Sequence, residues 1–140
     1  MHLTLIGYWL AEHAPDWPDV QSFVDSTWSS DEREAVIEWL ESGVGMRFSL
    51  GPSICRLCGR RNGSSEASDG RFLWPAGLSH YVREHDVRLP TQLVERALQR
   101  PAVDRGRLEV AEREDEELSV DYEWWRNQWP DWKRPRQYGL

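Results

Sequence analysis

Two cysteines and two histidines near the middle of the chain have the spacing of a metal site. They occur as a Cys-x2-Cys pair, an interval of twenty-one residues, and a His-x4-His pair. Two thiolates separated by two residues can point into one small volume from a tight turn, and two imidazoles near a helix end can complete a tetrahedron around Zn²⁺. The pattern predicts a Zn²⁺ site with these ligands: Cys55, Cys58, His80 and His85.

The same residues have a plainer interpretation, in which the cysteines are buried thiols and the histidines are ordinary core or surface residues. His80 and His85 are five positions apart, which corresponds to about 140° around an ideal helix. Both rings can reach one ion only if the last helical turn widens or if His85 lies just beyond the helix. Asp86 and Pro90 are compatible with such an ending. We expect the metal site, because the cysteine pair and the histidine pair occur together.

Catalytic interpretations of these residues are weaker than a structural one. A catalytic Zn²⁺ keeps one coordination position open, whereas four protein ligands close the tetrahedron. A redox Cys-x2-Cys pair would follow a thioredoxin-like order of strand and helix, which is absent. Ser79 and His80 are not a nucleophile and its base, since neighbours on a helix point apart. The sequence therefore predicts a structural Zn²⁺ cofactor and a protein that is not an enzyme.

The residues between the two pairs predict a hairpin followed by a helix. An Asn-Gly and an Asp-Gly dipeptide mark turns, and two runs of hairpin length occupy 64–68 and 71–74. Pro75 suits the first turn of a helix, where its missing N–H would have no partner. We expect residues 52–90 to form a module of zinc knuckle, hairpin and helix.

Amphipathic helices are predicted on both sides of this module. Asp19 suits the N-cap of a helix that extends towards Trp28. Ser29 with Glu32 three residues later is a capping box for a second helix, and Gly43 suits its end. The pattern predicts an acidic helical region before the metal site.

Two further patterns complete the predicted fold. Residues 44–50 alternate between large apolar and small or polar residues, as in a half-buried strand. Apolar residues at helical spacing follow Pro90 and stop at Pro101. The prediction is a small single α+β domain, residues 1–100, in which the metal module is flanked by amphipathic helices.

Residues 101–140 differ in character from the rest. An arginine- and glutamate-rich stretch is followed by closely spaced tryptophans. We interpret this part as an acidic linker and a Trp-rich C-terminal segment that packs on the body or on a partner, because a free tail rarely exposes so much aromatic surface. The candidate partner contacts are Trp124, Trp125, Trp129 and Trp132.

Charge and hydropathy indicate the expected cellular location of the protein. The net charge is −7, distributed as −7 over residues 1–54, +2 over residues 55–90 and −2 over residues 91–140. No apolar stretch has the length of a membrane span, and the apolar residues 3–10 are too short for a secretory signal. We expect a cytoplasmic protein with no membrane partner, in which the thiols stay reduced and available to a metal.

A family resemblance rests on the run DGRFLWPAGLSHYVREHDVRLP at 69–90, on Cys55-x2-Cys58-Gly59 and on Asn-Gly-Ser at 62–64. With the Gly-Tyr-Trp at 7–9 and the Phe-Val-Asp at 23–25, it resembles a group of small uncharacterised bacterial zinc-finger-like proteins. Their shared pattern reads roughly Cys-x2-Cys-Gly, Asn-Gly, Asp-Gly, Trp-Pro-x-Gly-Leu-x-His-Tyr-Val, His, Val-Arg-Leu-Pro. The resemblance covers about residues 5–98 and implies a zinc-finger-like module without an assigned activity.

Two functions remain open at this point. An acidic protein suits a basic protein partner, because complementary charge speeds encounter and selects partners. We therefore expect a non-enzymatic, zinc-stabilised protein-binding module that acts as an adaptor, an immunity-type inhibitor or a subunit of a larger assembly. The alternative is a nucleic-acid-associated regulator, which requires the arginines of the module to share one face. Those arginines are Arg56, Arg60, Arg61, Arg71, Arg83 and Arg88.

Overall fold

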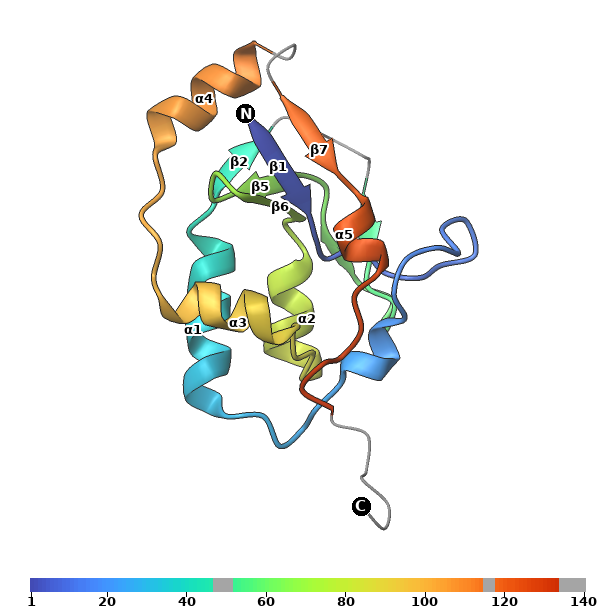
Figure 1. The fold of residues 1–140 in the computed structure, drawn as a ribbon. Helices are drawn as coiled ribbons and strands as arrows, with labels where there is room; N and C mark the ends of the chain where they lie inside the picture. The colour runs from blue at the N-terminus through green and yellow to red at the C-terminus, as the bar shows by residue number, and fades with distance from the viewer. Residues whose placement is uncertain (47–51, 115–117, 134–140) are drawn as a thin grey trace.

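The computed structural model describes residues 1–46, 52–114 and 118–133. Within these residues a mixed five-stranded sheet lies beside a group of helices, which confirms the predicted small α+β domain (Figure 1). The strands of this sheet are β1 (His2–Leu5), β2 (Val44–Met46), β5 (Glu66–Ser68), β6 (Phe72–Pro75) and β7 (Ser119–Asp121). No helix among the described residues is both long enough and apolar enough to cross a membrane.

The order of the sheet is β2-β5-β6-β1-β7. Strands β2, β5 and β6 pair antiparallel, and the β5–β6 pair is the hairpin predicted around Asp69-Gly70. The prediction of a second turn at Asn62-Gly63 was wrong, because these residues lie in a strand. Strand β1 lies parallel to both β6 and β7, so that Leu3 is opposite Val120. One edge of the sheet therefore joins residues from the two ends of the described chain.

A second, two-stranded sheet carries the cysteines. It consists of β3 (Ser53–Ile54) and β4 (Arg61–Gly63), which pair antiparallel.

The predicted strand over residues 44–50 is present as β2 up to Met46, and the rest of that prediction lies outside the described residues.

Three helices pack together below the sheet in Figure 1. They are α1 (Ser30–Glu41), α2 (Leu78–His85) and α3 (Thr91–Leu98). The Ser29 hydroxyl accepts a hydrogen bond from the Glu32 N–H at 3.4 Å, as the capping-box pattern predicts. Glu32 does not return this bond, because its carboxylate accepts from the Trp28 indole at 2.9 Å instead.

The helix predicted between Asp19 and Trp28 is shorter than expected. Asp19 is the N-cap, but only one 3-10 turn follows it, η1 (Val20–Phe23). The Asp25 carboxylate accepts hydrogen bonds from the Thr27 N–H at 3.0 Å and the Thr27 hydroxyl at 2.7 Å. Such local bonds compete with helical ones and end the helix early.

The prediction that Pro75 lies in the first turn of a helix was wrong. Pro75 is the last residue of β6, where it lies opposite Glu66, and α2 begins at Leu78. A proline at the end of a strand needs to donate no ladder hydrogen bond. The hairpin therefore extends closer to the helix than the sequence suggested.

The C-terminal segment folds back on the body. After α4 (Arg105–Arg113), β7 adds to the sheet and α5 (Glu123–Arg126) places Trp125 in the main core, where it is 0% exposed. Trp125 packs against Trp9 and Phe23, with ring centroids 5.3 and 6.3 Å apart. Aromatic side chains from both ends of the described chain thus share one core.

Candidate metal centre

The four predicted ligands converge at one place. Cys55, Cys58, His80 and His85 each offer a ligand atom, and these atoms all lie within 4.8 Å of one another. Cys58 Sγ is 3.4 Å from His80 Nε2. Around a tetrahedral ion with ordinary bonds to sulfur and nitrogen, ligand atoms are roughly 3.3 to 3.8 Å apart. The cluster is therefore close enough to hold a metal ion.

The cysteines lie on a knuckle that follows β3. The Cys55 N–H donates to the Arg60 carbonyl at 2.8 Å, and the Gly59 N–H donates to the Cys55 carbonyl at 2.9 Å. Gly59 has a φ of +75°, a conformation that glycine adopts without steric cost. The Leu57 N–H donates to Cys55 Sγ at 3.4 Å, which helps to orient this sulfur. Cys55 is buried, whereas Cys58 is exposed.

The histidines occupy the last two turns of α2, and the end of this helix is widened. The Asp86 N–H donates to the Tyr81 carbonyl, five residues back instead of four, and Asp86 has a φ of +56°. His85 is the last helical residue. Its ring centroid lies 5.1 Å from that of His80. This widened turn overcomes the five-residue spacing that would separate the rings on a regular helix.

The electrostatics of the histidines suit metal binding. His85 Nε2 is buried and has no hydrogen-bond partner in the described part of the chain. An orphaned buried nitrogen is uncommon in proteins, and a metal ion would satisfy it. Burial, and next the neighbouring His85, lower the pKa of His80. This shift favours the neutral imidazole that a metal requires.

The knuckle and the helix are held together next to the ligands. The Tyr81 hydroxyl, one residue after His80, accepts a hydrogen bond from the Arg56 N–H at 2.8 Å. At the other end of α2, Gly77 packs directly on Asn62 of β4. Neither contact could be predicted from the sequence, because each joins residues that are distant along the chain.

A substitution at Gly77 is expected to disturb this junction. A Cβ atom there would lie 2.5 Å from the backbone oxygen of Asn62, so Gly77→Ala must push β4 away from α2. We expect a loss of about 1 to 3 kcal/mol in the free energy of unfolding, measured by urea denaturation. Gly45→Ala is the matched control, because a Cβ there meets nothing within 4 Å. Equal effects at both glycines would contradict the close junction.

The arginines proposed for nucleic-acid binding are engaged in different ways. Arg83 pairs with Glu41 of α1 at 2.8 Å, and Arg88 pairs with Asp25 at 2.9 Å. The hydrogen bond from Arg83 lowers the pKa of Glu41. Of the remaining four, the Arg71 guanidinium lies over the ring of Phe72, 5.4 Å from its centroid, and Arg56 donates to the Ile54 carbonyl. Arg60 on the knuckle and Arg61 in β4 are exposed.

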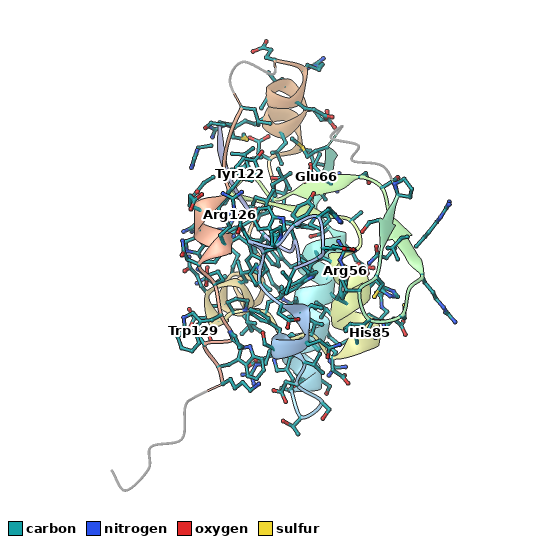
Figure 2. The ribbon with its side chains drawn as sticks, turned by 90° about the vertical axis from the view of Figure 1, so that its right-hand side faces the viewer. Arg56, Glu66, His85, Tyr122, Arg126 and Trp129 are labelled. Atoms are coloured by element: carbon teal, nitrogen blue, oxygen red, sulfur yellow. The ribbon has the colours of Figure 1, made fainter. Side chains whose placement is uncertain are left out.

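The four candidate contact tryptophans have unequal exposure. Trp125 is in the core, and its indole N–H donates to the Tyr8 carbonyl at 2.6 Å. The Trp132 indole donates to the Arg88 carbonyl at 3.1 Å, and Trp124 packs against Phe72. Trp129 is 56% exposed and is labelled at the lower left of Figure 2. Among these four, Trp129 presents the largest surface to a partner.

The fold and the cluster define a small α+β protein with a four-residue candidate metal site. Comparisons with protein-family models, with curated proteins and with solved structures found no match. The interpretation of this site therefore rests on the geometry and chemistry of the chain itself.

Proposed function

We propose that this protein is a non-enzymatic protein-binding module in which the ion is a structural Zn²⁺. The observation that carries the proposal is the convergence of four protein ligands, two sulfur and two nitrogen, within 4.8 Å. This donor set suits tetrahedral Zn²⁺. With four protein ligands no position is left for water or substrate, so the ion supplies stability and not chemistry.

A structural Zn²⁺ here would join two parts of the fold. Cys55 and Cys58 belong to the knuckle after β3, and His80 and His85 belong to α2, which packs on the acidic helix α1. The ion would hold these parts in a fixed arrangement and present a rigid surface. Residues 1–54 carry a net charge of −7, which supports a basic protein as the partner.

The closed site can be tested separately from the partner. Elemental analysis of the purified protein should give one zinc per chain. The Zn²⁺ is then exchanged for Co²⁺, whose visible spectrum reports its coordination, and azide is added. A closed site leaves the spectrum unchanged. A spectrum that changes with azide would show an open position, and the non-enzymatic proposal would be lost.

The partner is tested by its charge. We expect a cross-linked partner, identified in the native cell and then purified, to be basic and to associate more slowly as ionic strength rises. An association rate that does not change with ionic strength would contradict the proposal that the partner is recognised by its positive charge. The nucleic-acid alternative is weakened by the ion pairs of Arg83 and Arg88, and we expect no salt-sensitive binding to labelled duplexes.

A further inference from the structure

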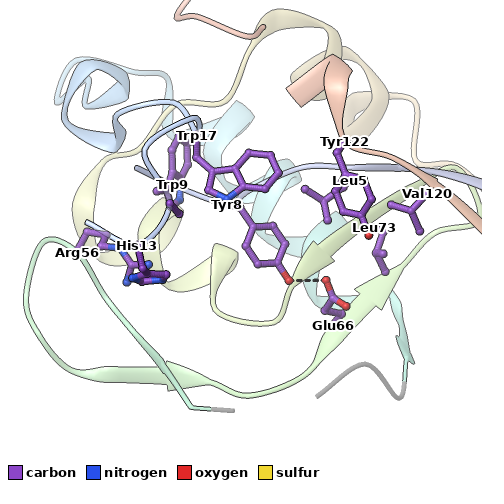
Figure 3. Close-up of a pocket in the computed structure, with 11 residues that line it drawn as sticks. Leu5, Tyr8, Trp9, His13, Trp17, Arg56, Glu66, Leu73, Val120 and Tyr122 are labelled. Carbon is purple, nitrogen blue, oxygen red and sulfur yellow. Dashed lines mark hydrogen bonds between the residues drawn. The ribbon is translucent and has the colours of Figure 1, made fainter. Parts of the chain in front are cut away.

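A cleft that is lined by none of the four metal ligands has no role in the function proposed so far. Its volume is about 460 Å³, and Arg56 of the knuckle lies at one of its ends (Figure 3). Most of the lining is apolar or aromatic, but one acidic side chain reaches it. The residues that matter for its chemistry are Tyr8, Trp9, His13, Trp17, Arg56 and Glu66.

Glu66 is an unusual residue for a buried position. It is 5% exposed and lies in β5, and the Tyr8 hydroxyl donates a hydrogen bond to its Oε2 atom. No ion pair to Glu66 occurs in the described part of the chain. A buried carboxylate without a cation is costly, and such groups usually acquire one. A cationic ligand in the cleft would therefore stabilise the ionised form of Glu66, which burial alone disfavours.

Aromatic rings form the walls next to this carboxylate. The rings of Tyr8 and Trp17 have centroids 5.9 Å apart. The guanidinium of Arg126 already lies over Trp17, 4.9 Å from its centroid. Aromatic faces attract cations through their quadrupoles and also accommodate an aliphatic stem. The walls and Glu66 together suit a cation at the end of an apolar chain.

The other end of the cleft carries nitrogen-containing side chains and, among the described residues that line it, no acid. Figure 3 shows Arg56 and His13 at that end, away from Glu66. The Arg56 guanidinium and one ring nitrogen of His13 are donors, so they favour a carbonyl or another acceptor on the ligand. A ligand with an ammonium group at one end and a carbonyl at the other would match both ends.

We propose that this cleft binds the side chain of a lysine presented by the basic protein partner. The ammonium group would bind Glu66 and the Tyr8 hydroxyl, the stem would lie along the aromatic wall, and main-chain carbonyls would face Arg56. The inference rests on the proposed protein-binding function and adds the chemistry of the anchor residue.

The test uses small probes on the full chain. Nα-acetyl-lysine N-methylamide is titrated while NMR follows the indole N–H signals of Trp9 and Trp17. We expect roughly millimolar binding, as for a fragment of this size. The isosteric 2-aminoheptanoic acid probe, in which a methyl group replaces the ammonium group, should bind about tenfold more weakly or not at all. Equal binding of the two probes would overturn the proposal.

A matched pair of variants assigns the effect to the buried carboxylate. Glu66→Gln keeps the shape and the acceptor for Tyr8 but removes the charge, and it should weaken lysine-probe binding about tenfold or more. Glu95→Gln changes an exposed acid on α3 and should leave binding unchanged. Unchanged binding in Glu66→Gln would overturn the proposal.

A free amine is the other source of the same chemistry. The probe n-butylammonium carries the charge and the stem without the carbonyls. If it binds as tightly as the lysine probe, a free amine is favoured and the lysine proposal is overturned. If Glu66→Gln leaves the partner complex intact, the lysine anchor fails while the protein-binding function stands. If no basic partner is found, the function fails independently.

The Glu66→Gln substitution should also change how the free energy of unfolding depends on pH. Burial raises the pKa of Glu66 above its unfolded value near 4.5, so the folded protein holds this proton more tightly. The free energy of unfolding therefore falls as pH rises from about 4.5 through the raised pKa. Glutamine does not titrate, so the variant does not lose stability in this way. Relative to the unsubstituted protein, the variant should be more stable at about pH 7 than at about pH 4.

Urea denaturation of both proteins at each pH measures this difference. Protonation of the metal ligands at low pH affects both proteins alike and cancels in the comparison. A variant whose advantage grows at low pH would contradict the buried-charge interpretation of Glu66.

Discussion

Replacing Cys55 with serine is expected to abolish stoichiometric metal binding and to lower the free energy of unfolding by several kcal/mol. A structural Zn²⁺ contributes on the order of 10 kcal/mol in zinc-finger peptides, which have little other core. Here the loss should be smaller, because the main core contains buried Trp9, Trp74 and Trp125. Elemental analysis measures the metal, and urea denaturation with and without a strong chelator measures the stability.

The matching variant Cys58→Ser separates loss of metal from the burial of a hydroxyl. Cys58 is exposed, so serine there remains solvated, whereas serine at the buried Cys55 adds a desolvation cost. The chelator should lower the stability of the unsubstituted protein and should leave the stability of either variant unchanged. A chelator-insensitive protein, or a Cys58→Ser variant that keeps one zinc per chain, would remove the metal site.

Trp125→Ala is expected to cost about 3 to 5 kcal/mol of unfolding free energy. The side chain is 0% exposed, and it fills the space between Trp9 and Phe23. Its indole N–H also donates to the Tyr8 carbonyl at 2.6 Å, which would lose this partner. Thermal or urea denaturation measures the effect.

Trp129→Ala is the control for this prediction, because it removes the same side chain from an exposed position four residues later. Trp129 is 56% exposed, so the change in stability should stay within about 0.5 kcal/mol. If the tryptophan segment did not pack on the body, the two substitutions would have similar small effects. Weaker partner binding by Trp129→Ala alone would place it in the interface.

The local parts of the fold could be predicted from the sequence. The ligand spacing, the Asp69-Gly70 turn and the serine cap act over a few residues, and the structure has the clustered ligands, the hairpin and α1 where they were expected. The Asn62-Gly63 dipeptide is the exception, because it pairs as part of β4 and does not form a turn. Short-range patterns succeed here because turns and caps depend on backbone geometry that a few residue types dictate.

The non-local parts could not be predicted. The parallel pairing of β1 with β6 and β7 joins residues more than sixty positions apart, and no short pattern encodes it. The burial of Glu66 depends on its position in β5, where the carboxylate points into the cleft beside Tyr8. The widened end of α2 was a requirement of the predicted site, but its hydrogen bond to Tyr81 is visible only in the structure.

The pairing of β1 with β7 has a consequence for the protein during its synthesis. Strand β1 can join β6 as soon as residues 72–75 have left the ribosome, but its other edge stays bare until residues 119–121 follow. An open strand edge is a template for pairing with other chains. In the finished sheet the two outer strands, β2 and β7, have three residues each. The nascent chain is therefore more prone to self-association than the completed fold.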